Sequence, residues 1–100
     1  MRRVVEGKVY DTATATEICD VSEGRSGDFE QVVAELYQTK KGAFFLDGWG
    51  GAATRFKKSV QGNGWAGSDA TIPLTIEEAR TYCEKFAPHK VENFFEVEEA

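Results

Sequence analysis

Short apolar runs separated by turn residues fill the start of the chain. Residues 4–5 (Val-Val) and 8–10 (Lys-Val-Tyr) are β-prone and lie on either side of Glu6-Gly7, a dipeptide suited to a tight turn. The pattern predicts an N-terminal pair of strands.

The next stretch is less regular. Asp11 and Thr12 offer side-chain oxygens that can cap a helical turn. Residues 14–21 combine threonines with isolated aliphatic residues, a pattern compatible with either a short helix or a strand. Residues 22–28 hold two glycines, two serines and three charged residues without apolar periodicity, so they predict a loop.

The clearest pattern lies between Phe29 and Asp47. β-branched and aromatic residues recur in residues 32–39 and 43–46, on either side of Lys40-Lys41-Gly42. Such runs around a short glycine-containing turn are typical of an antiparallel hairpin. We expect this hairpin to form the centre of the sheet.

Residues 48–69 hold six glycines and both tryptophans, Trp49 and Trp65. This composition is too irregular for one long element. We expect a long, partly mobile loop, within which residues 52–60 form a short helix or strand.

A helix is predicted over residues 75–87. Residues 75–78 (Thr-Ile-Glu-Glu) match a capping box, with Thr75 at the N-cap and Glu78 at N3. Pro88 ends this helix, and residues 91–97 predict a second short amphipathic segment before the acidic tail. Five residues at helical spacing form one apolar stripe facing the sheet: Ile76, Ala79, Tyr82, Cys83 and Phe86.

Together these elements predict a single α+β domain over residues 1–100, a small antiparallel sheet of about four or five strands with a C-terminal helix packed on one face. A chain of 100 residues leaves no room for a second hydrophobic core. No apolar stretch approaches the roughly 20 residues of a membrane span. Residues 1–6 lack the apolar region of a secretory signal, so we expect a cytoplasmic protein.

Candidate chemistry is sparse. Cys19 and Cys83 are predicted to be reduced thiols, as in most cytosolic proteins. His89 is the only histidine and no Cys-x-x-Cys pair is present, so the usual zinc ligand sets cannot be filled. No pair of carboxylates is singled out by spacing for acid and base work. We expect no metal, no cofactor and no catalytic residues.

One glycine motif suggests a nucleotide site at first sight. Residues 48–53 (Gly-Trp-Gly-Gly-Ala-Ala) satisfy a GxGxxA pattern, and Asp69 lies downstream as a ribose-binding acid would. A tryptophan between the first two glycines is awkward at a pyrophosphate turn, and the chain cannot supply repeated βαβ units. The glycines more simply allow backbones or aromatic rings to approach closely.

Charge is unevenly distributed around a net of −5. Eight acidic residues oppose two basic ones between residues 6 and 39, and seven glutamates oppose three basic residues from residue 77 onward. Mixed charge keeps a small domain soluble, but acidic flanks also offer a face for recognition. Between them lies a basic centre made of Lys40, Lys41, Arg55, Lys57 and Lys58.

Four segments in this order carry a resemblance: residues 10–15 (YDTATA), 36–46 (LYQTKKGAFFL), the turn at 48–51, and 72–80 (IPLTIEEAR). The chain resembles small, mostly uncharacterised proteins encoded on phages, prophages and other bacterial mobile elements. The resemblance covers nearly the whole chain and implies no catalytic residues. Trp49 departs from it, because a polar or acidic residue is expected there. Proteins from that setting include inhibitors of host defence, among them anti-CRISPR proteins, to which this chain is similar in size and charge.

These observations predict a non-enzymatic protein-binding inhibitor, an anti-CRISPR or other anti-defence protein whose acidic surface engages a basic, nucleic-acid-binding effector. The alternative is a small nucleic-acid-binding module that uses the basic centre, with the tryptophans as stacking platforms; a small-molecule enzyme is a third hypothesis. At least one tryptophan is expected to pack in the core. The predicted partner-binding residues are eight acids and both tryptophans: Glu23, Asp28, Glu30, Glu35, Trp49, Trp65, Glu92, Glu96, Glu98 and Glu99.

Overall fold

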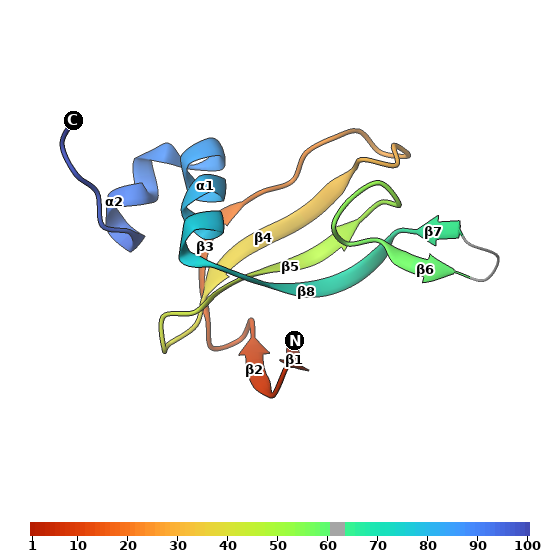
Figure 1. Ribbon diagram of the computed structural model, residues 1–100, viewed down its shortest axis with the longest axis horizontal. Coiled ribbons are helices and arrows are strands. Elements are labelled where there is room, and N and C mark those ends of the chain that lie inside the picture. The colour runs from red at the N-terminus through yellow and green to blue at the C-terminus, as the bar shows by residue number, and fades with distance from the viewer. Residues whose placement is uncertain (61–63) are drawn as a thin grey trace.

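A four-stranded antiparallel sheet in the order β3-β4-β5-β8 forms the middle of the protein (Figure 1). The structure is a computed structural model that describes residues 1–60 and 64–100, and at 59, 60, 64 and 65 it describes the backbone alone. Its strands are β3 (Thr16–Asp20), β4 (Val32–Gln38), β5 (Phe44–Gly50) and β8 (Ser68–Leu74). Two separate hairpins pair β1 (Arg2–Val5) with β2 (Lys8–Asp11) and β6 (Lys58–Val60) with β7 (Gly64–Ala66). The predicted α+β class is confirmed.

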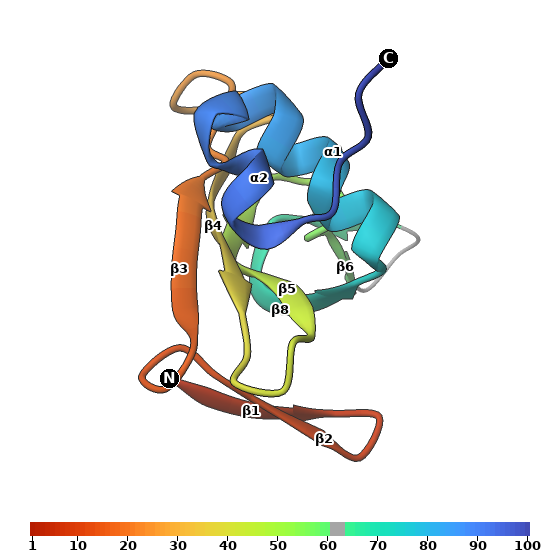
Figure 2. The same cartoon turned by 90° about the vertical axis from the view of Figure 1, so that its left-hand side faces the viewer.

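Helices follow the last strand and cover one face of the sheet (Figure 2). They are α1 (Ile76–Phe86), the 3₁₀ turn η1 (Pro88–Lys90) and α2 (Val91–Phe94). The β1–β2 hairpin lies apart from them, beside the turn that joins β4 to β5 (Figure 2). No helix within the described ranges is long and apolar enough to cross a bilayer.

The N-terminal pair of strands is confirmed. Glu6 and Gly7 have φ values of 51° and 77°, and two successive residues with positive φ match the twist of a tight hairpin. Val4 consequently pairs with Val9 across the two strands.

Residues 14–21, whose sequence pattern is compatible with either a short helix or a strand, contain the strand β3. Asp11 closes a turn before it: its Oδ1 accepts a hydrogen bond from the Ala13 amide at 2.9 Å, and its carbonyl accepts one from the Ala15 amide at 3.0 Å. A bulge between Glu17 and Cys19 shifts the register of β3 against β4. The Ile18 carbonyl at this bulge accepts a hydrogen bond from Lys90 Nζ at 2.8 Å.

The central hairpin is confirmed, with β4 and β5 paired from Val32 opposite Gly50 to Gln38 opposite Phe44. Thr39 closes its turn, because its amide donates to the Ala43 carbonyl at 2.8 Å and its Oγ1 accepts from the Ala43 amide at 3.0 Å.

The expected long loop over residues 48–69 is wrong. Residues 48–50 complete β5, and half of the remaining described residues of the segment belong to β6, β7 and the start of β8. Residues 61–63 lie outside the described part of the chain. Within 52–60 only Lys58–Val60 is a strand. The glycines do not end β5. Because glycine has no side chain, other residues can pack directly against the strand backbone at these positions. A Cβ at Gly50 would come within 2.6 Å of the Phe56 ring, which is only 1% exposed.

The glycine motif therefore lies inside an antiparallel strand and its following turn, so the dinucleotide interpretation fails. A pyrophosphate site needs the glycines between a strand and the N-terminus of a helix. Here residues 51–54 are bonded instead to the preceding loop: the Gly51 amide donates to the Gln31 carbonyl and the Ala53 amide to the Phe29 carbonyl, both at 2.8 Å.

The capping box of α1 is confirmed. The Glu78 amide donates to Thr75 Oγ1 at 3.1 Å, and the Thr75 amide donates to Glu78 Oε1 at 3.0 Å. Ala79 and Cys83 are buried, but Ile76 is 63% exposed, so its place in the predicted stripe is wrong. Ile76 is the first residue of α1, and β8 ends at Leu74, where it pairs with the first residue of β5.

The main core lies between the sheet and the helices. Phe44 stacks on Phe95 with ring centroids 4.9 Å apart, which brings the segment after α2 against the sheet, whereas Val97 is exposed. Cys19 and Cys83 are buried and no disulfide joins them; Cys83 Sγ donates a hydrogen bond to the Ala87 carbonyl at 3.6 Å. Burial, followed by the neighbouring Cys83, raises the pKa of Cys19 to about 11.

Candidate functional site

The face of the sheet opposite α1 carries acidic and aromatic side chains. Ala34, Leu36, Phe44 and Leu46 point into the main core, and side chains alternate along a strand, so their neighbours in sequence point the other way. We call this second surface the open face. Its residues, from strand alternation and cross-strand pairing, are Glu17, Asp20, Val33, Glu35, Tyr37, Phe45, Asp47, Trp49, Asp69, Thr71 and Pro73.

Three carboxylates lie side by side across the middle of the open face. Asp20 pairs directly with Glu35, and Glu35 pairs directly with Asp47; we call these residues the acidic row. Adjacent strands are about 4.8 Å apart, and like charges placed directly opposite one another destabilise a sheet. The acidic row is thus expected to lower the free energy of unfolding.

Electrostatics reflect this crowding. Partial burial raises the pKa of Glu35, and the charges of Asp20, Glu17 and Asp47 raise it further. The pKa of Tyr37 is raised by the same kind of burial and then by Glu35, Glu17 and Asp47. Negative potential is therefore concentrated on this part of the open face.

Hydrogen bonds hold the two outer carboxylates in place. Asp20 Oδ1 accepts a hydrogen bond from the Ser22 amide at 2.7 Å, and bonding to Ser22 lowers the pKa of Asp20. Asp47 Oδ1 accepts one from Thr71 Oγ1 at 2.8 Å. Both ends of the acidic row are consequently oriented by the protein itself.

Trp49 lies in the next row of the open face, between Val33 and Asp69. A Cβ on Gly67 would lie 2.6 Å from Trp49 Cζ2, so the indole lies close over this glycine. Trp49 is half-buried and Val33 exposed. Apolar surface thus adjoins the acidic row, and Trp49 is not a core residue.

Aromatic rings close the opposite end of the open face. Phe45 is fully buried between Tyr37, stacked at 5.1 Å, and Tyr10 of β2, edge-on at 5.3 Å. Tyr10 thereby anchors the β1–β2 hairpin at this end of the open face, while Glu35, Asp47 and Trp49 remain partly exposed.

Of the ten predicted partner-binding residues, the structure brings Glu35 and Trp49 together on the open face. Glu23 instead forms an ion pair with Lys85 of α1 at 2.9 Å. Asp28 Oδ2 accepts a hydrogen bond from the Arg25 amide at 3.2 Å, in the loop over residues 22–31 that also holds Glu30. The side chain of Trp65 lies outside the described residues.

The four C-terminal acids lie elsewhere. Glu92 is in α2, and Glu96, Glu98 and Glu99 follow it. Figure 1 shows the loop over residues 22–31 extending from α1 away from the C-terminus, so that α1 lies between the tip of this loop and the C-terminal acids. The predicted acids therefore do not form one continuous surface.

Four acids of the open face were not predicted as site residues: Glu17, Asp20, Asp47 and Asp69. The alternation of residues 33–37 and 45–49 contains the signal, since both runs place an acid between apolar or aromatic residues of the same face. Finding the acidic row also requires the register, with Tyr37 opposite Phe45.

The basic centre is divided. Lys40 and Lys41 are in the turn before β5, whereas Arg55, Lys57 and Lys58 follow its end. A seven-residue strand separates the two groups by about 20 Å. Arg55 is also paired with Glu78 at 3.5 Å and lies 3.3 Å from the Tyr82 hydroxyl.

Residues with catalytic or ligand chemistry are dispersed. His89 is exposed in η1, and no group of three or more His, Cys, Asp or Glu side chains among the described residues is placed to hold a metal ion. Comparison with protein-family models, curated proteins and solved structures finds no match. The function of the chain is therefore inferred from its own residues.

Proposed function

We propose that this protein is a non-enzymatic protein-binding inhibitor whose open face engages a basic surface of a nucleic-acid-binding protein. The acidic row carries the proposal. Three carboxylates aligned across adjacent strands work against sheet stability, and a cost of this kind is typical of residues retained for function.

The chemistry of the open face suits arginine and lysine side chains. Arginine binds carboxylates through paired, charge-assisted hydrogen bonds, and Asp20 and Asp47 are already oriented by Ser22 and Thr71. Trp49 adds an aromatic surface on which a cationic side chain can stack. Oriented acceptors on a sheet lose little conformational freedom on binding, which favours affinity.

Inhibition would follow from competition for the partner's basic surface. A surface that binds phosphates is complementary to a fixed row of negative charge, which also accelerates association. In its specific form, the proposal is that the chain is a phage or mobile-element protein of the anti-CRISPR or anti-defence kind, acting in the cytoplasm on a nucleic-acid-binding effector.

The alternative, direct nucleic-acid binding, has less support. Contiguous cations are needed to follow a phosphate backbone, but Lys40 and Lys41 are separated from Lys58 by the length of β5. Trp49 adjoins carboxylates that would repel phosphates.

The binding face can be tested with an arginine-rich peptide as the probe and amide chemical shifts as the readout. We expect titration with hexa-arginine to shift the amides of β4 and β5 around Glu35, Asp47 and Trp49. The double variant Glu35→Gln/Asp47→Asn should weaken binding by about tenfold or more. The matched control Glu98→Gln/Glu99→Gln changes the net charge equally and should bind as the unmodified protein does. Shifts confined to the C-terminal acids, or equal losses in both variants, would contradict the proposed face.

Inhibition needs a second experiment. The unmodified protein and both double variants would be used to capture partners from a bacterial lysate, followed by binding kinetics and an activity assay on the captured protein. We expect a nucleic-acid-binding partner whose activity falls with the unmodified protein and the C-terminal control but not with the open-face variant. Nanomolar or micromolar binding to DNA or RNA without a protein partner would support the alternative instead.

A further inference from the structure

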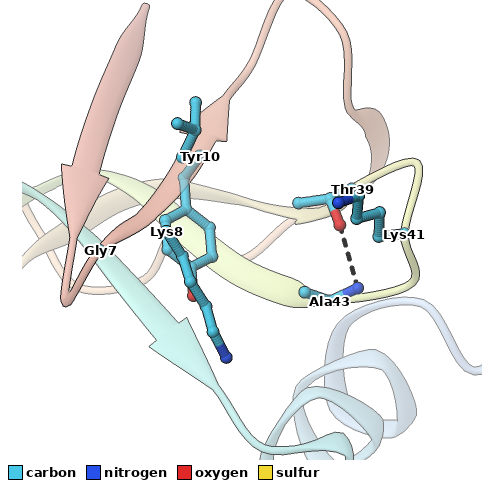
Figure 3. A pocket seen from close by; sticks show the side chains of 7 residues that line it. Gly7, Lys8, Tyr10, Thr39, Lys41 and Ala43 are labelled. Atoms are coloured by element: carbon cyan, nitrogen blue, oxygen red, sulfur yellow. Dashed lines mark hydrogen bonds between the residues drawn. The ribbon is translucent and has the colours of Figure 1, made fainter.

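A cleft of about 590 Å³ separates the first hairpin from the turn that joins β4 to β5 (Figure 3). Residues 7–10 form one wall, and Thr39, Lys41 and Ala43 form the other. This volume lies within the range of small-molecule sites, which combine apolar walls with a few polar groups. None of these residues belongs to the acidic row or neighbours Trp49.

Tyr10 is the most buried residue of the cleft. Its ring packs edge-on against Phe45 and the residue is only 6% exposed, yet its hydroxyl has no hydrogen-bond partner among the described residues. No fully buried polar side-chain atom of the described chain lacks a partner, so this hydroxyl must reach the solvent of the cleft. A tyrosine hydroxyl in such surroundings normally finds a partner, and an occupant of the cleft can supply one.

Two cations contribute from opposite walls. Figure 3 shows Lys8 extending from β2 beside Tyr10, and Lys41 in the facing turn. Neither lysine has an ion pair with a carboxylate in the described part of the chain. Thr39 Oγ1 accepts a hydrogen bond from the Ala43 amide at 3.0 Å, which leaves its hydroxyl hydrogen free to donate.

The polar side chains of the cleft can therefore all donate hydrogen bonds. Lys8 and Lys41 can only donate hydrogen bonds, and the Tyr10 and Thr39 hydroxyls can do so. Within residues 1–60 and 64–100, no carboxylate lines the cleft, while Val9 and Ala43 supply apolar surface. Hydrogen-bond donors and two positive charges around one cleft favour an anion as its occupant.

We propose that this cleft is a binding site for a small organic anion that carries a carboxylate or a phosphate on an apolar body. The anionic group contacts Lys8, Lys41 and the Tyr10 hydroxyl, and the apolar body lies against Val9 and Ala43. The site is separate from the acidic row. Because its two walls belong to different sheets, a bound anion also fastens the hairpin to the rest of the protein.

Phenyl phosphate and benzoate serve as probes for the two anion types, and benzyl alcohol serves as the neutral control. We expect at least one anion to shift the amides of Lys8, Tyr10 and Ala43 in a saturable manner and to raise the melting temperature, while benzyl alcohol does neither. The anion that binds more tightly identifies the preferred group. No saturable shift with either anion, or equal shifts with benzyl alcohol, would overturn the proposal.

Variants locate the binding groups. Lys41→Met and Tyr10→Phe should each weaken binding by about tenfold, the loss expected for one charge-assisted hydrogen bond. Tyr10→Phe keeps the ring on Phe45, so the fold should survive, as an unchanged amide spectrum outside the cleft would verify. Lys40→Met removes the neighbouring lysine, which does not line the cleft, and should leave affinity unchanged. An equal loss in Lys40→Met would reduce the site to nonspecific attraction and overturn it.

Discussion

Glu35 has a carboxylate on each side of it across the sheet, Asp20 and Asp47. Its partial burial adds to this repulsion, and together they raise its pKa in the folded protein. A carboxyl whose pKa is higher in the folded than in the unfolded state binds protons preferentially when folded. Glu35 therefore lowers stability at neutral pH, and this cost disappears as the pH falls through its raised pKa toward the unfolded value near 4.3.

We expect Glu35→Gln to raise the free energy of unfolding at pH 7 by about 0.5 to 1 kcal/mol, since it removes repulsion between directly opposed charges. The gain should shrink near pH 4, where Glu35 of the unmodified protein is largely protonated. Urea unfolding at the two pH values measures both quantities. Glu98→Gln, in the exposed tail, is the control and should change stability at neither pH; an equal gain from Glu35→Gln at both would contradict the electrostatic explanation.

At the scale of elements, the turn after β5 depends on one side chain. The Phe56 side chain packs against Gly50 and is almost completely buried. Phe29, whose carbonyl accepts a hydrogen bond from the Ala53 amide in the same turn, is 75% exposed. Two phenylalanines close in space are thus in opposite environments.

Phe56→Ala should lower the free energy of unfolding by about 3 to 5 kcal/mol, the cost of truncating a buried aromatic residue. Phe29→Ala should change it by less than about 0.5 kcal/mol, as is usual for exposed positions. Chemical denaturation of both variants checks the difference. Similar losses in the two would mean that Phe56 does not fill the space above Gly50.

Elements whose signal is local could be predicted from the sequence: the Glu6-Gly7 turn, the central hairpin and the capping box at Thr75 each depend on residues a few positions apart. Residues 48–50 could not, because Gly48 makes room for β4 at Val33 and Ala34 and Gly50 makes room for Phe56, and no local pattern reveals these contacts. The acidic row could not be predicted for a related reason. Its members come from three strands, and only the register brings them together.

Buried apolar surface is distributed unevenly over the whole molecule. The strands β3, β4, β5 and β8 share the main core with α1, but the β1–β2 hairpin contributes little beyond Tyr10, and its cross-strand pair Val4 and Val9 is exposed. Elements with little buried apolar surface open at lower free energy than the core.

Amide hydrogen exchange should therefore be fastest in the hydrogen-bonded amides of β1 and β2 and slowest in β4 and β5, with at least about a hundredfold difference in protection. Mass spectrometry of peptides covering residues 1–11 and 32–50 measures it. Equal protection of the two regions would show that the hairpin unfolds only with the whole domain.

The two outer strands of the main sheet are both interrupted. Lys90 occupies a carbonyl at the bulge of β3, and β8 contains Pro73, which has no amide hydrogen to offer. Such features discourage the addition of a further strand. Strand addition by a partner's main chain, as in many complexes with extended peptides, is therefore disfavoured at both edges. Contacts with a partner are therefore expected to come from side chains, and self-association by strand stacking is disfavoured for the same reason.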